Sequence, residues 1–191
     1  MTKSIMITGV GGQGTLLASR ILGRLAISAG YDVKVSEVHG MSQRGGSVVT
    51  YVRYGEKVFS PIIDLGGADV LLAFESLEAY RYLPYLKAGG RLIVNTQHMM
   101  PMPVVTGAAK YPAGIEEEMA GKARTTLVDA LALAKEAGET RSVNVVLLGV
   151  LAQSLQFSHE AWRDALKATV KPAFLAANEK AFELGYGLKE E

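Results

Sequence analysis

The sequence predicts an α/β protein with three layers, in which helices cover both faces of a mixed, mostly parallel sheet and further helices follow at the C-terminus. Short apolar runs alternate with segments in which apolar residues recur every three or four positions, as they do in βαβ units. A glycine-rich loop also joins the first apolar run to the first helical segment. Together these features indicate a Rossmann-like α/β/α arrangement.

Length and composition favour one compact domain over residues 1–191. The chain is 49% hydrophobic and has a formal net charge of +1, which gives no argument for binding nucleic acid or an anionic membrane. No apolar run reaches the roughly 18–20 residues that cross a bilayer, and the N-terminal residues lead directly into the first expected strand. We therefore expect a cytoplasmic protein without a secretory signal.

The absence of cysteine excludes several kinds of chemistry. The chain can form no disulfide, thiolate nucleophile or cysteine-ligated iron–sulfur cluster of its own. Its three histidines, His39, His98 and His159, are far apart and lack metal-ligand spacing, so no metal site is expected. No Ser–His–Asp order and no pair of catalytic carboxylates can be recognised.

The first elements follow from simple apolar patterns. Residues 5–8 are mostly apolar without alternation, which predicts a strand buried on both faces. Apolar side chains recur every four positions over residues 14–29, which predicts a helix, and Gly30 is expected to end it. Tyr31–Val35 then predicts a second strand.

A hairpin is expected next. The segment Ser47–Tyr54 is β-branched and aromatic, which predicts a long strand. Gly55 and Glu56 suggest a turn, after which residues 57–60 would return antiparallel and Pro61 would close the hairpin. This hairpin is the reason for expecting a mixed sheet.

The remaining elements alternate between strands and helices. Strands are expected over residues 68–74 and 91–95 and near Leu127, with Ala88-Gly89-Gly90 as a break before the second of these. Residues 96–112 are rich in Met and Pro and predict an irregular connection. Helices are expected over residues 76–87 with Ser76 as N-cap, 129–137, 143–156, 159–170 with Ser158 as N-cap, and 172–184.

The first glycine-rich loop is Gly9-Val10-Gly11-Gly12-Gln13-Gly14. Glycines let the backbone approach a ligand, and the first N–H groups of the following helix point at an anion. Gln13 can both donate and accept a hydrogen bond. We therefore predict a cofactor-binding role for Gly9, Gly11, Gly12, Gln13 and Gly14. The alternative is that the glycines only permit a tight turn and close helix–strand packing.

The second loop, Ser36 to Gly46, follows the second expected strand and combines Glu, His, Met, Gln, Arg and paired glycines. If the two strands before the loops are parallel neighbours, both loops emerge at the edge where open α/β sheets bind ligands. Glu37 lies near the position of the ribose-binding acid of dinucleotide sites.

Two residues of the second loop are candidates for catalysis. Arg44 could grip a carboxylate or phosphate, with the N–H groups of Gly45 and Gly46 alongside in a cofactor-binding role. It could equally form an ion pair with Glu37 or with a partner that only holds the loop. His39 could move a proton near neutral pH or serve as a hydrogen-bonded anchor of the loop.

Three further polar residues lie near the expected ends of strands or helices. Glu75 is either functional or an acid favoured by the dipole of the next helix, and the dipole is the preferred explanation. Asn95 ends a strand and could reach the same crevice. Asn144, near a helix start, is expected to cap the helix or bond the backbone.

These residues resemble a known family, the gamma-type subunits and domains of 2-oxoacid:ferredoxin oxidoreductases. The version of the second loop found here, Glu-x-His-Gly-Met-Ser-Gln-Arg-Gly-Gly, is most similar to that of the small subunits of indolepyruvate ferredoxin oxidoreductases. The resemblance covers nearly the whole chain and includes Val52-Arg53-Tyr54-Gly55, Ser60-Pro61, Ala68-Asp69, Phe74 to Ala79, Asn144, Leu148-Gly149, Asn178, Ala181, Phe182 and Gly185.

The resemblance implies a subunit of an enzyme that oxidises aryl pyruvates to acyl-CoA and carbon dioxide and passes the electrons to ferredoxin. Thiamine diphosphate and iron–sulfur clusters would belong to a large partner subunit, and this chain alone would bind no cofactor. It would complete the active site for the 2-oxoacid and could contact coenzyme A, the co-substrate.

Three alternatives stay open at this point. The chain could be the gamma subunit of a pyruvate or other 2-oxoacid enzyme. It could be a self-sufficient Rossmann-type protein that binds NAD or a flavin. It could also be a structural subunit whose glycine-rich loops serve only an interface.

Overall fold

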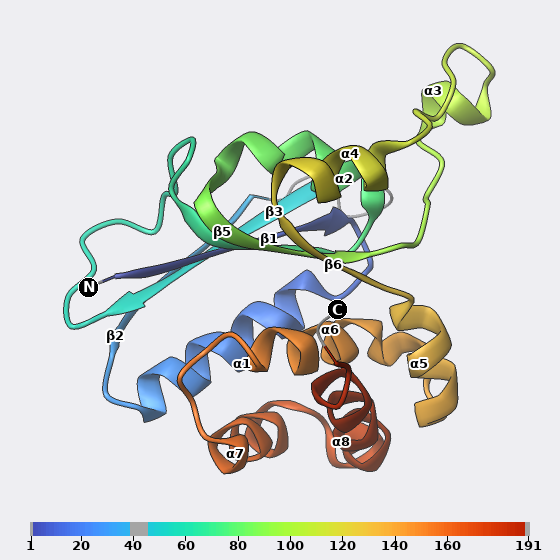
Figure 1. Ribbon diagram of the computed structural model, residues 1–191. Coiled ribbons are helices and arrows are strands. Elements are labelled where there is room, and N and C mark those ends of the chain that lie inside the picture. Colours follow the sequence, from blue (N-terminus) through green and yellow to red (C-terminus); the bar gives the residue numbers. More distant parts are fainter. Residues whose placement is uncertain (1, 39–45, 190–191) are drawn as a thin grey trace.

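A computed structural model describes residues 2–38 and 46–189 of the protein, and a six-stranded sheet lies at its centre, between two layers of helices (Figure 1). The strands are β1 Lys3–Val10, β2 Asp32–Val38, β3 Ser47–Gly55, β4 Ala68–Ala73, β5 Leu86–Asn95 and β6 Arg124–Val128. The helices are α1 Thr15–Ser28, α2 Ser76–Tyr82, α3 Met102–Val105, α4 Ile115–Lys122, α5 Ala130–Ala137, α6 Val143–Ala152, α7 His159–Thr169 and α8 Pro172–Tyr186, with the 3₁₀ turns η2 Leu83–Tyr85 and η3 Thr140–Ser142.

The sheet is mixed and mostly parallel, as the sequence predicts. The strand order is β2-β3-β1-β4-β5-β6. Strands β1, β4, β5 and β6 pair in parallel, whereas β3 is antiparallel to both β1 and β2. The mixed character of the sheet therefore comes from β3, and not from a strand that follows it.

The prediction of a return strand over residues 57–60 is wrong, since the described residues between β3 and β4 contain no strand. Side chains bind the backbone groups of this region, so these groups are not available to a ladder of strand hydrogen bonds. The Arg53 guanidinium donates to the carbonyl oxygens of Ser60 at 2.9 Å and Ile62 at 2.8 Å. The Val58 N–H donates to the Asp32 carboxylate at 2.8 Å.

Strands β1 and β2 run in the same direction but are not neighbours, since β3 lies between them. The premise that the two strands are direct neighbours is therefore wrong. Its consequence nevertheless holds, because two strands that are both antiparallel to β3 end at the same edge of the sheet. We call this edge, where β1, β2, β4, β5 and β6 end, the carboxyl edge.

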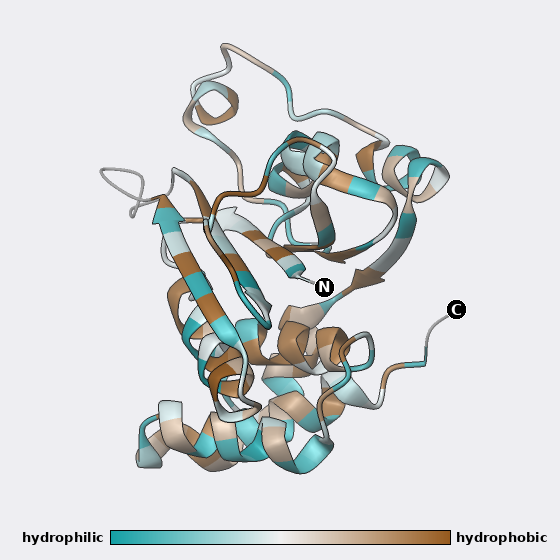
Figure 2. Ribbon diagram, turned by 90° about the vertical axis from the view of Figure 1, so that its left-hand side faces the viewer, coloured by the Kyte–Doolittle hydropathy of each residue, from teal (hydrophilic) through white to brown (hydrophobic). Residues whose placement is uncertain are grey.

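Alternating residues of the strands supply two separate cores. Ile5 and Ile7 of β1 belong to the larger core, which α1, α5, α6, α7 and α8 cover. Met6 faces the opposite side and packs in the smaller core beneath α2 and α4. Figure 1 shows this unequal division into layers, and Figure 2 shows apolar residues running along the strands between them. Among the helices of the described residues, none has the length and apolar character needed to cross a bilayer.

Most element predictions are confirmed, with ends that differ by a few residues. Ser158 caps α7 by accepting a hydrogen bond from the Ala161 N–H at 3.1 Å. The N-cap of α2, however, is Glu75 and not Ser76, because the Glu75 carboxylate accepts from the Glu78 N–H. Helix α2 also ends at Tyr82, since Pro84 cannot continue it.

Three elements differ from expectation in the second half of the chain, the first being the short helix α3, which lies in the segment expected to be irregular. Strand β5 begins at Leu86, so Gly89 and Gly90 lie within it, beside a shift of register against β4. Helix α4 is absent from the prediction because only Ile115 and Met119 of its eight residues are buried, which leaves little apolar periodicity.

Helices α6 and α8 pack so closely that two glycines are required at their contact. A Cβ atom on Gly149 would lie 2.2 Å from the Phe182 carbonyl oxygen. One on Gly185 would lie 2.0 Å from the Val146 carbonyl oxygen. Any side chain at either position would push the two helices apart.

We predict that Gly185→Ala lowers the free energy of unfolding by about 1–3 kcal/mol or more, since overpacking a tight contact has a cost of this size. Denaturant unfolding of the purified chain measures the change. Gly121→Ala is the control, because Gly121 is a helical glycine and a Cβ added to it would meet no atom within 4 Å. This control should be neutral or stabilising by up to about 1 kcal/mol. Equal stability of the Gly185→Ala variant and the wild type would contradict the proposed packing.

Candidate functional site

The first glycine-rich loop contacts Gly46, the last residue of the second, at the carboxyl edge of the sheet. The Gly11 N–H donates to the Gly46 carbonyl oxygen at 2.9 Å, which joins the first loop to the residue that precedes β3. Of the predicted residues of the second loop, Gly46 is described and half-buried. His39, Arg44 and Gly45 lie outside the described residues, so their predicted roles stay predictions.

A cavity of about 520 Å³ opens beside this junction. It lies between the first loop, the first turns of α1 and the facing ends of β2 and β3. The residues that line it are Gly11, Gly12, Gly14, Thr15, Leu16, Arg20, Glu37, Val38, Val48 and Thr50. Its volume is within the range of small-molecule sites.

Backbone N–H groups at the start of α1 give this cavity an anion-binding character. Gly14 is the N-cap, has φ +85° and provides no side chain to cap the helix. Leu17 and Ala18 donate to the Gly14 carbonyl oxygen. Within residues 2–38 and 46–189, no hydrogen bond engages the N–H groups of Thr15 and Leu16. Unpaired N–H groups at the positive end of a helix dipole favour a phosphate or carboxylate.

Two charged side chains flank these N–H groups. Arg20 is exposed on α1 and lines the cavity, where it adds positive charge. Glu37 also lines the cavity, and its carboxylate accepts from the Ser19 hydroxyl of α1 at 2.9 Å. The cavity can therefore accept an anion beside α1 and a hydroxyl or amine donor near Glu37.

Gln13 braces the first loop instead of lining the cavity. Its Oε1 accepts from the Val10 N–H at 2.7 Å, and its Nε2 donates to the Phe74 carbonyl oxygen at 2.9 Å. A Cβ on Gly9 would lie 2.8 Å from the same Oε1 and 3.1 Å from the Phe74 Cβ, so a side chain there would displace the Gln13 amide from its contacts. The contact at Gly9 agrees with the packing alternative for the glycines, and Gln13 has a structural partner on each side of its amide. Gly11, Gly12 and Gly14 line the cavity, and their cofactor-binding role stays a prediction.

Asn144 supports the same loop from α6. Its Nδ2 donates to the Gly14 carbonyl oxygen at 3.2 Å, and its Oδ1 accepts from the Val145 N–H at 2.9 Å. The expected backbone-bonding role of Asn144 is thus confirmed. Asn95 is also fully buried and bonds the Phe74 carbonyl oxygen and the Ala130 N–H, so it does not reach a crevice.

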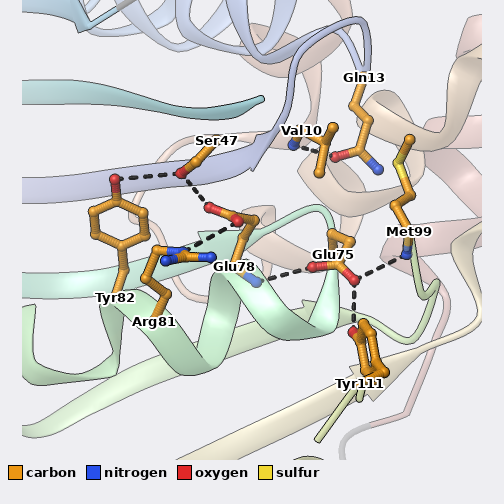
Figure 3. A network of polar contacts seen from close by, with 9 residues as sticks. All are labelled: Val10, Gln13, Ser47, Glu75, Glu78, Arg81, Tyr82, Met99 and Tyr111. Atoms are coloured by element: carbon orange, nitrogen blue, oxygen red, sulfur yellow. Dashed lines mark hydrogen bonds and ion pairs between the residues drawn. The ribbon is translucent and has the colours of Figure 1, made fainter. Parts of the chain in front are cut away.

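Two buried carboxylates lie behind the loops at the start of α2 (Figure 3). Glu75 is 1% exposed, and its oxygens accept from the N–H groups of Glu78 and Met99 and from the Tyr111 hydroxyl. Burial, with the hydrogen bond to Glu75, raises the pKa of the Tyr111 phenol above its usual value. Glu75 is therefore a structural cap, as the helix-dipole interpretation suggests.

Glu78 is a residue that the sequence interpretation missed. It is 4% exposed, accepts from the Ser47 hydroxyl and forms an ion pair with Arg81 at 3.3 Å (Figure 3). Ser47 is the first residue of β3, so Glu78 fixes the point at which the second loop rejoins the sheet. Two acids three positions apart at a helix start were the available signal, but Ser47, the partner of Glu78, is distant in sequence.

Metal binding finds no support in the part of the chain that the structure describes. There, no three His, Asp or Glu side chains lie close enough together to hold a metal ion.

The family model of the pyruvate ferredoxin/flavodoxin oxidoreductases matches residues 4–188. The chain belongs to this family. The resemblance noted in the sequence is therefore confirmed, and the cavity lies in a family domain that occupies nearly the whole chain.

Similar curated proteins share almost their full length with the chain. The "Indolepyruvate oxidoreductase subunit IorB" proteins of Thermococcus kodakarensis and Pyrococcus horikoshii are each 45% identical over 98% of this chain and 96% of their own. A "2-oxoglutarate synthase subunit KorC" of Methanothermobacter marburgensis is 29% identical over 97% of this chain and 95% of its own.

The fold is also found in a solved structure of the family. The gamma subunit of a keto/oxoacid ferredoxin oxidoreductase from Geobacter sulfurreducens superposes with a TM-score of 0.71 and 30% identity, and 96% of each chain is covered. The predicted α/β fold class is confirmed by this comparison and by the observed sheet.

We predict that Gln13→Glu lowers the free energy of unfolding by about 1–3 kcal/mol at neutral pH. The carboxylate can still accept from Val10, but its second oxygen would face the Phe74 carbonyl oxygen without a proton between them. Thermal or denaturant unfolding measures the loss. Gln156→Glu, at an exposed glutamine, is the matched control and should change stability by less than about 0.5 kcal/mol. The bracing role is refuted if the two variants are equally stable.

Proposed function

We propose that this chain is the small subunit of an indolepyruvate oxidoreductase, in which it completes the active site for the CoA-dependent oxidative decarboxylation of aryl pyruvates. The observation that carries the proposal is the 45% identity, over nearly the full length of both chains, to proteins named as subunits of that enzyme. The anion-binding geometry of the loop at α1 is compatible with a site for acidic substrates.

The proposal assigns the redox chemistry to a large partner subunit. Thiamine diphosphate and the iron–sulfur clusters would be bound there, and ferredoxin would receive the electrons through the complex. The lack of cysteine in this chain supports that assignment, because thiolates are the usual ligands of iron–sulfur clusters. The contribution of this chain is then to bind and orient the substrates.

Coenzyme A is the acidic substrate that the loop would contact. Its phosphate oxygens would accept hydrogen bonds from the N–H groups of Thr15 and Leu16. The glycines at positions 11, 12 and 14 would allow the phosphates to approach the backbone closely. Arg20 would add charge to the same phosphates. Glu37 would lie near a hydroxyl or amine group of coenzyme A.

His39 and Arg44 remain candidates for the reacting end of the site. Arg44 would bind the carboxylate of the 2-oxoacid or a phosphate, with the N–H groups of Gly45 and Gly46 beside it. His39 would hold the loop or move a proton. The contact between Gly11 and Gly46 supports a place for this loop beside the cavity.

A gamma subunit for a different 2-oxoacid is the nearest rival. The relative that carries the 2-oxoglutarate name has 29% identity, against 45% for the indolepyruvate relatives, and this difference favours aryl pyruvates. A self-sufficient protein that binds NAD or a flavin is the rival from another class. Tight binding of either nucleotide by the isolated chain would favour that rival.

Reconstitution is the test of the proposed function. We predict that indolepyruvate and CoA reduce a dye acceptor when this chain is mixed with its large subunit, and that either chain alone has less than about one tenth of that rate. The reason is that each chain holds only part of the site. The rates with pyruvate or 2-oxoglutarate in place of indolepyruvate measure the specificity for the oxoacid. Full activity of the large subunit alone would refute the proposal.

The contact with coenzyme A has its own test. We predict that Gly12→Asp raises the KM for CoA about tenfold, or about 1.4 kcal/mol, and changes the KM for the oxoacid much less. A carboxylate would then face the phosphates. Gly12 is exposed with φ +102°, a conformation that Asn and Asp tolerate better than most residues.

Gly12→Asn is the matched control for this test, because it has the same shape without the charge. It should affect the KM for CoA only slightly. Equal effects of Gly12→Asp on both substrates, or equal effects of the two variants on CoA, would exclude phosphate binding at this loop.

A further inference from the structure

Residues Met99–Tyr111, which we call the arm, leave the carboxyl edge after β5 and carry the short helix α3. None of them is buried, and α3 stands clear of the sheet and of the other helices in both views (Figure 1 and Figure 2). Yet its large exposed side chains are mostly apolar: Met100 is 51%, Met102 69% and Val105 64% exposed. The arm adds nothing to either core of the chain.

The base of the arm is held firmly. The Met99 N–H donates to the Glu75 carboxylate at 3.0 Å, and the Tyr111 hydroxyl donates to the same oxygen at 2.7 Å (Figure 3). His98 stacks on the Tyr111 ring with centroids 4.7 Å apart, and its Nε2 lies 2.6 Å from Glu116. Both ends of the arm are therefore fixed by buried or half-buried groups of the body.

The arm is also ordered along its length by its own hydrogen bonds. The N–H groups of Val105, Thr106 and Ala109 donate to preceding carbonyl oxygens within the arm. Pro101 and Pro103 further restrict its backbone. Ordering a segment costs conformational entropy, and an exposed apolar segment gains nothing in return within its own chain. This combination is typical of a preorganised contact for another protein.

The position of the arm indicates which protein that is. Strand β5, which leads into the arm, runs parallel with β4 and β1, so the arm and the first glycine-rich loop leave the same edge of the sheet. Under the proposed function, on which this inference rests, the large subunit must cover that edge to complete the site. The arm contains no carboxylate and one cation, Lys110, so it fits an apolar groove with a neutral or acidic rim.

We propose that the arm is a docking element for the large subunit, in which Met100, Met102 and Val105 enter an apolar groove of that subunit beside the shared active site. Methionine side chains adapt to the shape of such a groove. Glu75 and Tyr111 are positioning residues in this proposal, since they fix the base of the arm relative to the sheet.

Measurement of the affinity for the large subunit tests the proposal. The variant Met102→Asp/Val105→Asp places two charges on the arm, and its thermal midpoint should equal that of the wild type because neither side chain is buried. We expect the Kd for the large subunit, measured by biolayer interferometry, to rise about tenfold or more. Leu65→Asp is the matched control: Leu65 is 70% exposed, against 69% for Met102, and its loop lies at the opposite edge. Its Kd should stay within about twofold of the wild type.

Three results would overturn the proposal. If the wild-type chain binds the large subunit and the double variant binds equally well, the arm is not the docking element and the proposed function stands. If the wild-type chain does not bind at all, the proposed function fails together with the inference. If the wild type forms a dimer in sedimentation that the double variant loses, while the Kd for the large subunit is unchanged, the arm binds a second copy of this chain.

Discussion

The antiparallel position of β3 between β1 and β2 is the constraint on which the candidate site depends. Because both neighbours run opposite to β3, the loop after β1 and the segment after β2 lie at one edge, and β3 starts at that edge. The hydrogen bond from Gly11 to Gly46 then joins the two loops. A parallel pairing of β1 with β2 would leave no strand between them to carry Gly46 to the first loop.

Polar side chains around this junction are used mainly to fix the backbone. Gln13 bonds Val10 and Phe74, Asn144 bonds Gly14, and Glu78 bonds Ser47. A buried polar group needs such partners, since an unpaired one costs free energy. The result is a loop whose polar side chains are occupied by backbone partners, while Thr15 and Leu16 at the start of α1 line the cavity. Binding by backbone groups on a braced loop needs little rearrangement when a ligand arrives.

Local signals in the sequence were sufficient for much of the fold. The period of apolar residues predicts α1, and Ser158 caps α7 as its position suggests, because both depend on residues within a few positions. The pairing of β3 and the role of Gln13 depend on distant residues, such as Phe74, 61 positions away. The return strand at residues 57–60 was a local inference that Arg53 and Asp32 overrule through side-chain hydrogen bonds. The candidate site was located from its glycines and Glu75 was recognised as an acid at a helix start, but Glu78 was not, since its partner Ser47 is 31 positions away in the sequence.

The first turn of α2 connects the candidate site with the arm. Glu78 holds Ser47 at the entry to β3, and Glu75, three residues earlier, holds both ends of the arm through Met99 and Tyr111. The Glu75 carboxylate also accepts from the Glu78 N–H, so the two acids form one rigid unit. A protein that binds the arm would thereby act on the helix turn that also holds Ser47 at the start of β3. One turn of helix therefore supports both the base of the arm and the strand that begins beside the candidate site.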